Sequence, residues 1–130
     1  MTAIRSTFLR AVIGLDAGVC GLLGAGLAAG VASDVAGLSR AFTQPLGLFL
    51  LGYAALLVWL AVKPQLPRLA VRALVAFNVL WAVESVLIVA LGWVTPSPLG
   101  QALLYVQAAG ALGVAAMQTL ALRMARPMAA

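Results

Sequence analysis

The sequence predicts an all-α integral membrane protein, a bundle of four transmembrane helices with both termini in the cytoplasm. Three observations predict this fold. Of the 130 residues, 65% are apolar and 8% are charged, with a mean hydropathy of +1.13, whereas soluble domains are about half apolar and a quarter charged. The apolar residues form four long runs, and the basic residues gather in alternate connections. We therefore expect a single transmembrane domain over residues 1–130.

The four apolar runs cover residues 11–32, 46–62, 73–94 and 99–122. About 17 to 25 helical residues cross a bilayer core of ~30 Å, so each run is long enough to span it. The first run and the basic residues before it could instead form a signal peptide. However, this run is longer than the apolar segment of a signal peptide and contains Asp16. We therefore expect it to remain as a transmembrane helix.

Two proline residues indicate where the second and fourth helices begin. Pro45 and Pro98 lie at the start of these runs, and proline suits the first turn of a helix, where its missing N–H would have no partner. Thr43 and Ser97 lie just before them and offer side-chain oxygens as N-caps.

The basic residues predict the orientation of the chain. On one side of the membrane lie Arg5, Arg10, Lys63, Arg68, Arg72, Arg123 and Arg126, against Arg40 alone on the other. This bias follows the positive-inside rule and predicts a multi-pass protein of the cell inner (cytoplasmic) membrane, with cytoplasmic N and C termini. The topology and contact with lipid head groups explain the net charge of +5. The expected partner is thus the lipid bilayer, and no nucleic-acid role is assigned.

The two halves of the chain resemble each other and suggest a parallel two-plus-two internal repeat. Residues 10–16 match residues 72–78 in a basic first residue, apolar middle residues and a polar last residue, and both even-numbered runs begin with Pro-Leu-Gly. A true repeat would place Asp16 and Asn78 in equivalent positions. The alternative is a chance match between segments rich in Ala, Leu and Gly.

Several polar side chains lie inside the expected spans, where they are functional candidates because burying them in lipid is costly. Asp16 and Asn78 lie about 9 Å into the apolar core, and Gln118 lies about 7–8 Å in, so the three could form one polar layer. Glu84 is deeper, at about 18 Å, and Tyr53 lies near 15 Å, close to the midplane. The spans contain no basic residue that could pair with the two acids.

These polar residues support two interpretations. In the functional one they form a proton-coupled or cation-binding site, with Glu84 exchanging a proton and Asp16 as a second acceptor. In the structural one, protonated carboxyl groups donate hydrogen bonds between helices, each worth ~1 kcal/mol. The sequence favours the structural role for Asp16 with Asn78 and leaves both roles open for Glu84.

The first span also carries a stripe of small residues, Gly14, Gly18 and Gly21. Such stripes let helix backbones approach closely, so we expect them to pack either within the bundle or against a second copy of the chain. On the third span, Trp81 shares one face with Asn78 and Ser85 and is a candidate contact for an apolar ligand.

The composition argues against an enzyme. The chain has no His and a single Cys, so Ser–His and Cys–His arrangements are absent. We expect no catalytic residue, no metal site and no cofactor.

Three functions remain compatible with this composition. The first is a small non-enzymatic inner-membrane protein that acts through helix–helix contacts, as a homo-oligomer or as an accessory subunit of another membrane protein. The second is a small oligomeric proton-coupled transporter or channel that uses Glu84 and Asp16. The third is a membrane protein that binds a quinone or a lipid, with Trp81, Tyr53 and Asn78 as contacts.

Overall fold

The computed structural model describes residues 3–124 and is mostly helical. Its four long helices are α1 (Thr7–Ala28), α3 (Arg40–Ala61), α4 (Arg68–Ala90) and α5 (Pro98–Met124). All four are long and apolar enough to cross a membrane, so the prediction of four helices of spanning length is confirmed. The shorter elements are the helix α2 (Val31–Ala36) and the strands β1 (Ala3–Ile4) and β2 (Leu66–Pro67).

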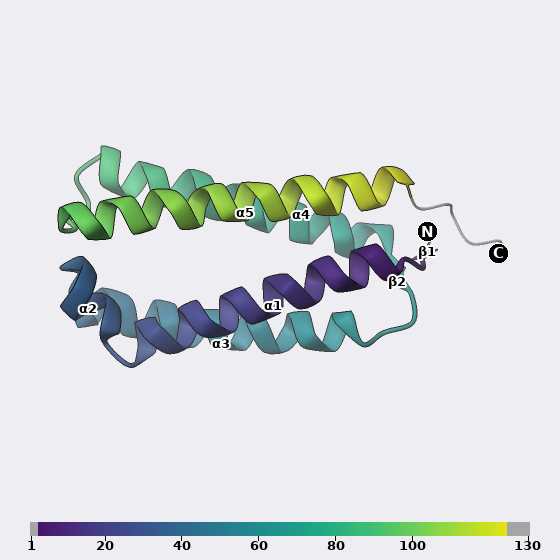
Figure 1. The fold of residues 1–130 in the computed structure, drawn as a ribbon, viewed down its shortest axis with the longest axis horizontal. Coiled ribbons are helices and arrows are strands. Elements are labelled where there is room, and N and C mark those ends of the chain that lie inside the picture. The colour runs from purple at the N-terminus through teal and green to yellow at the C-terminus, as the bar shows by residue number, and fades with distance from the viewer. Residues whose placement is uncertain (1–2, 125–130) are drawn as a thin grey trace.

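The long helices form two antiparallel hairpins that lie side by side (Figure 1). In one hairpin α1 packs along α3, and in the other α4 packs along α5. The backbones of α1 and α3 come very close where Gly24 meets Gly47. A Cβ atom added to Gly47 would lie 2.7 Å from the Gly24 carbonyl oxygen, a distance that only glycine can accept. This contact fixes the first hairpin, whereas contacts between the hairpins are sparser.

The helix starts differ in part from the sequence prediction. Helix α5 begins at Pro98, and the Ser97 hydroxyl accepts a hydrogen bond from the Gly100 N–H (3.1 Å), as expected. Helix α3, however, begins at Arg40, so Pro45 lies inside it rather than at its start. Its cap is Ser39, and Thr43 is a buried residue within the helix. The apolar run begins after the true start of α3, because the first turn of a helix is fixed by its capping residue and does not require apolar side chains.

Helix α1 also begins earlier than its apolar run, at Thr7, where the Ser6 hydroxyl accepts from the Leu9 N–H (3.1 Å). It ends at Ala28 rather than continuing to residue 32, because Gly30 takes a left-handed conformation (φ 86°) that turns the chain into α2. The short helix then packs on the start of α5. There the Ser97 N–H donates to the Ala36 carbonyl (2.8 Å). We call this contact of α2 with the start of α5 the clasp.

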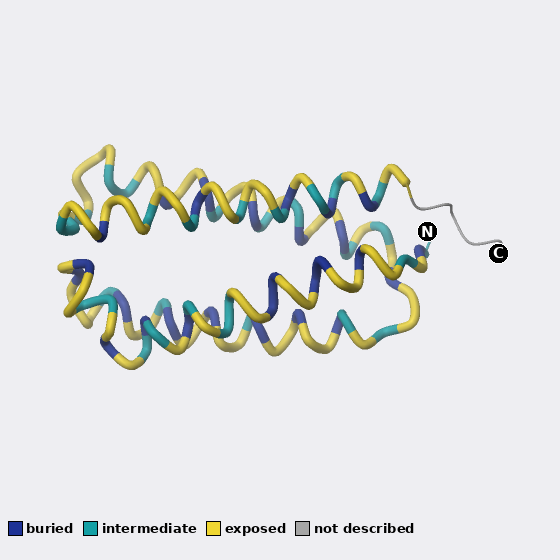
Figure 2. The backbone as a smooth tube through the Cα atoms, in the orientation of Figure 1, coloured by how far each residue is buried: buried dark blue, intermediate teal, exposed yellow. Residues whose placement is uncertain are grey.

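A second connection between the hairpins lies at the end of the bundle that carries the chain termini. Strands β1 and β2 pair in antiparallel fashion there, with Ile4 opposite Leu66, a small strand pair that the all-α prediction did not include. The main apolar core surrounds this pair, and Figure 2 shows the buried positions concentrated on the facing sides of the helices. Its fully buried members include Ile4, Leu9, Ile13, Leu57, Leu66 and Val71.

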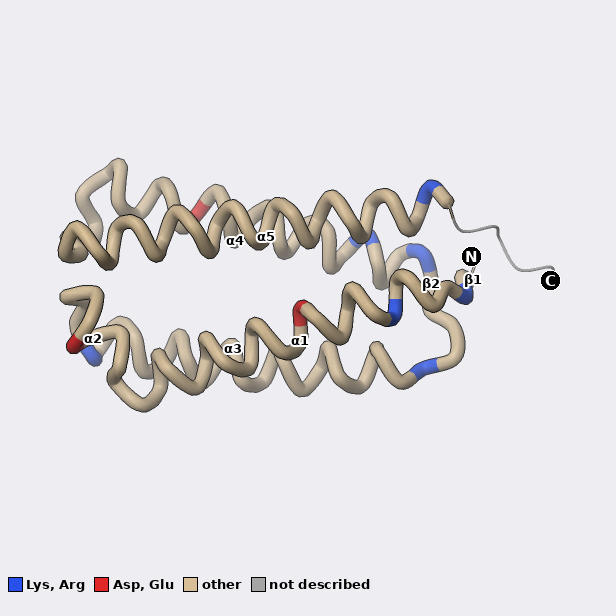
Figure 3. The backbone as a smooth tube through the Cα atoms, in the orientation of Figure 1, with Lys and Arg blue, Asp and Glu red and all other residues tan. Residues whose placement is uncertain are grey.

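The basic residues mark the same end of the bundle. Figure 3 shows Lys and Arg gathered near the termini, with a further basic position at the opposite end beside α2. Two of them bind exposed helix ends: Arg10 Nε donates to the Ala61 carbonyl (3.0 Å) and Arg68 Nη1 donates to the Leu122 carbonyl (2.9 Å). Both interactions place a positive charge at the negative end of a helix dipole. Arg126 lies outside the described residues.

Candidate functional site

A layer of polar side chains joins the two hairpins about a third of the way along the bundle. Asn78 Nδ2 of α4 donates to Asp16 Oδ2 of α1 (3.3 Å) and to Gln118 Oε1 of α5 (3.2 Å). All three residues are buried, Asp16 with 4% and Gln118 with 0% of its surface exposed. The sequence grouped these residues by depth alone, and the structure brings them into direct contact. We call Asp16, Asn78 and Gln118 the polar layer.

The Asp16 carboxylate in the polar layer is hydrogen-bonded by neutral groups and not by a cation. Asp16 accepts from the Asn78 amide and from the Cys20 thiol (3.4 Å), and its burial is therefore compensated by neutral donors. Gln118 Nε2 is buried with no hydrogen-bond partner among the described residues. A buried donor without a partner is unusual in a folded protein, so the hydrogen bonding of the polar layer is incomplete at this amide.

Tyr53 approaches the polar layer from α3. Its ring stacks on Phe77 of α4 at a centroid distance of 4.1 Å, and Phe77 stacks in turn on Trp81 at 6.0 Å. The Tyr53 hydroxyl is buried without a hydrogen-bond partner in the described part of the chain. The aromatic stack thus gives α3 and α4 a contact beside the polar layer.

A second polar network lies further toward α2, on the inner side of the α4–α5 hairpin. Trp81 Nε1 donates to Gln107 Oε1 (2.6 Å), and Gln107 Nε2 donates to Ser85 Oγ (2.8 Å). The Ser85 hydroxyl donates to the Trp81 carbonyl (2.7 Å). The sequence analysis did not select Gln107. The sequence did contain a sign of this network: an amide lies in the fourth span at a depth comparable to that of a tryptophan and a serine in the third. Such polar groups must find partners within the protein, because no water is available in the bilayer core.

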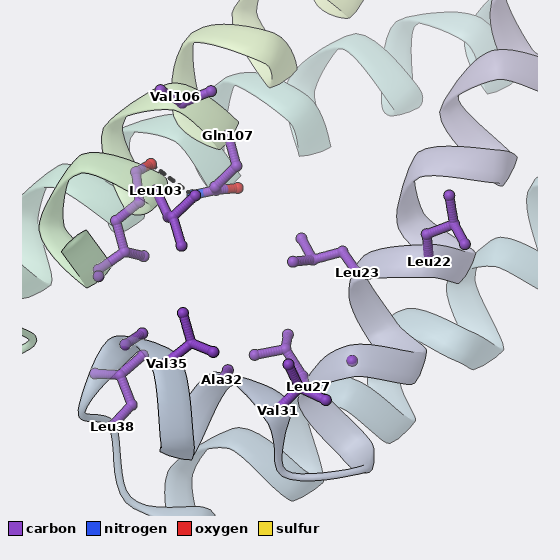
Figure 4. A pocket seen from close by; sticks show the side chains of 14 residues that line it. Leu22, Leu23, Leu27, Val31, Ala32, Val35, Leu38, Leu103, Val106 and Gln107 are labelled. Carbon is purple, nitrogen blue, oxygen red and sulfur yellow. Dashed lines mark hydrogen bonds between the residues drawn. The ribbon is translucent and has the colours of Figure 1, made fainter.

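Apolar cavities lie between the two hairpins, beside both networks and toward the clasp. Cavities of about 120, 340 and 580 Å³ lie there, and Leu23 of α1 and Gln107 of α5 line all three. We call these three cavities together the cleft. Figure 4 shows side chains of α1 and α2 on one side of the 340 Å³ cavity, facing Leu103 and Gln107 of α5 on the other. The walls are almost entirely apolar, and the cavities are partly open to the outside of the bundle.

Both intramembrane acids line the cleft. Asp16 forms part of the 580 Å³ cavity together with Cys20 and Asn78. Glu84 lines the 120 Å³ cavity, together with Ser85 of α4 and Phe42 of α3. Unlike Asp16, Glu84 is exposed, and no hydrogen bond or ion pair to its carboxylate is formed within residues 3–124. The two carboxylates thus line different cavities of the cleft and differ in their surroundings.

The small-residue stripe of α1 lies outside the close helix contact. Gly14 and Gly18 are exposed, and a Cβ atom on either would meet nothing within 4 Å. Gly21 reaches only ordinary contact distance, 3.9 Å, from the Ala54 Cβ. Close packing within the chain occurs at Gly24 and Gly47 instead, one turn further along α1. Pairing of the stripe with a second copy of the chain stays a prediction.

No family model, no curated protein and no solved structure matches this chain. The arrangement of its own residues therefore carries the functional argument. Over residues 3–124, no group of three or more His, Cys, Asp or Glu side chains is placed to hold a metal ion. What the geometry offers chemically is an apolar space between two hairpins with amides, hydroxyls and two carboxylates along its walls.

Proposed function

We propose that this chain is a small non-enzymatic protein of the cell inner membrane that binds an apolar, chain-shaped molecule, such as a lipid or a quinone, in the cleft. The single observation that carries this proposal is the apolar space around Leu23 and Gln107, partly open to the outside of the bundle. Sites for small molecules are typically apolar concavities with a few placed polar groups. The cleft has this composition.

The two ends of the cleft support the same proposal. The clasp closes it beside α2, and the polar layer with the apolar core closes it toward the termini. A molecule would therefore enter sideways from the bilayer. Its chain would meet Leu23 and Leu27, and its polar group could reach the Trp81–Gln107–Ser85 network.

The cleft can be filled without disturbing the helix contacts. Gly110 lines the 580 Å³ cavity, and a Cβ atom there meets nothing within 4 Å. Gly110→Leu should therefore fold normally and place its side chain in the cleft. Gly52→Leu is the matched control, because Gly52 is also exposed with open space around it but lies on α3 outside the cleft.

The experiment measures the apolar molecules that copurify with each variant, extracted and quantified by mass spectrometry. We expect a bound molecule with the wild type and with Gly52→Leu, and a clear loss with Gly110→Leu. Equal amounts in all three proteins, or no bound molecule in any, would contradict the proposal.

A second candidate function is proton-coupled transport by an oligomer. The observation that favours it is that Asp16 and Glu84 each line a cavity of the cleft, since intramembrane carboxyl groups serve as proton relays in transporters. This function requires a proton flux that depends on substrate in reconstituted vesicles and disappears in Glu84→Gln. The expected helix–helix contacts with a second copy or with another membrane protein are compatible with either function.

A further inference from the structure

The charge distribution around the cleft is one-sided. Asp16 and Glu84 both line it, and none of its lining residues is Lys or Arg. The described cations lie instead at the ends of the bundle (Figure 3). An occupant of the cleft therefore meets two carboxylates in an apolar surrounding and no cationic side chain.

The two carboxylates differ in how far they are already satisfied. Asp16 has 4% of its surface exposed and accepts from Asn78 and Cys20. Glu84 is exposed and lines the 120 Å³ cavity, with no partner in the part of the chain that the structure describes. A charged carboxylate that faces only lipid is costly. Glu84 is therefore the group that gains most from an added partner.

We propose that the molecule bound in the cleft carries a cationic amine head group that pairs with Glu84, while its apolar chain lies against Leu23 and Leu27. This inference rests on the proposed function and names the chemical class of its ligand. An ammonium group supplies both the opposite charge and the hydrogen-bond donors that the carboxylate lacks. The pair also removes the net charge from the apolar region, which neither partner does alone.

Three molecules with the same chain test the head group. Dodecylamine, dodecanol and dodecanoate differ in carrying a positive, a neutral and a negative head group. Each is used with bromine atoms on the chain, because bromine quenches tryptophan fluorescence on contact. Trp81 lines the cleft, whereas Trp59 and Trp93 are exposed at opposite ends of the bundle. In a Trp59→Phe/Trp93→Phe background, quenching in bilayer nanodiscs therefore reports contact with the cleft.

We expect the amine to bind about tenfold more tightly than the alcohol, equivalent to about 1.4 kcal/mol, with the carboxylate the weakest of the three. The affinities are calculated from the concentration of each molecule in the membrane, so that differences in partitioning into the bilayer do not affect the comparison. Glu84→Gln should reduce the ratio of amine affinity to alcohol affinity to about one, while the affinity for dodecanol stays unchanged. Asp34→Asn is the matched control, because Asp34 is an exposed acid in α2 that lines none of the three cavities.

The outcomes separate this inference from the proposed function. Equal binding of amine and alcohol overturns the cationic head group and leaves the cleft as a site for apolar chains. Loss of the amine preference in Asp16→Asn but not in Glu84→Gln overturns the assignment to Glu84. Quenching by none of the three molecules contradicts both proposals.

Discussion

Asp16 illustrates how one side chain can be buried in this bundle without a cation. Its carboxylate accepts from an amide and a thiol, so neighbouring helices supply the donors that water would otherwise provide. Asn78 is the centre of this arrangement, because its amide also reaches Gln118 and the Leu74 carbonyl. At the residue scale the polar layer therefore depends on Asn78 more than on either of its partners.

Asn78→Leu tests this dependence. A leucine removes the donor from both Asp16 and Gln118 and leaves their buried oxygens unpaired, so we expect a loss of about 1–2 kcal/mol in the free energy of unfolding. The measurement is equilibrium unfolding of the purified protein in mixed micelles. Gln101→Leu serves as the control, since Gln101 is an exposed amide of α5 bonded only to Tyr105. Equal stability of the two variants would show that the layer contributes nothing.

At the scale of elements, the contact within the first hairpin differs from the contact that joins the two hairpins. The pairing of α1 with α3 relies on direct backbone contact at Gly24 and Gly47, whereas the clasp relies on the close approach of Gly100 to Ala36 and on a backbone hydrogen bond. Contacts between the two hairpins are sparser than those within each hairpin, and the cavities of the cleft lie between them.

Gly47→Ala should disrupt the first hairpin. The added methyl group would clash with the backbone of α1, and overpacking of this kind costs about 1–3 kcal/mol. Gly52→Ala, one turn and a half further along α3, meets open space and should leave the unfolding midpoint unchanged. Thermal unfolding followed by circular dichroism compares the two. A stable Gly47→Ala protein would mean that the backbones can separate without loss.

At the scale of the whole molecule, the termini, the strand pair and most basic residues share one end of the bundle. The positive-inside rule predicts that this end faces the cytoplasm. The clasp and the loop before α5 would then face the opposite side of the membrane. This orientation decides from which leaflet a ligand reaches the cleft.

Cysteine labelling in intact cells measures the orientation. In a Cys20→Ala background, Thr95→Cys in the α4–α5 loop should react with a maleimide that cannot cross the membrane. Gln65→Cys in the α3–α4 loop should react only after the membrane is permeabilised. Both positions are outside the helices, and Gln65 and Thr95 are exposed, so access to the reagent differs by side alone. The reverse pattern would place the termini outside the cytoplasm.

The sequence predicted many of the residues of the candidate site, but not the contacts between them or the cavities that they line. Depth along the helix placed Asp16, Asn78 and Gln118 at one level, because each helical residue advances by about 1.5 Å. The same argument placed Tyr53 deeper, close to the midplane, whereas in the structure its ring stacks on Phe77, next to Asn78. It could not show that Gln107 bonds Trp81 and Ser85, nor that Gly14 and Gly18 face outward, because the rotation of each helix depends on its neighbours.

By itself, the sequence determined the four apolar helices and the concentration of basic residues at one end. The physical reason is that the bilayer solvates each residue according to its own polarity and its position along the chain. Only the tertiary structure decided that α1 pairs with α3 and α4 with α5, and that Asp16 is buried while Glu84 stays exposed. Within lipid, apolar faces have no preference between a neighbouring helix and an acyl chain, so close packing and polar contacts select the partners. Those contacts exist only once the helices have come together.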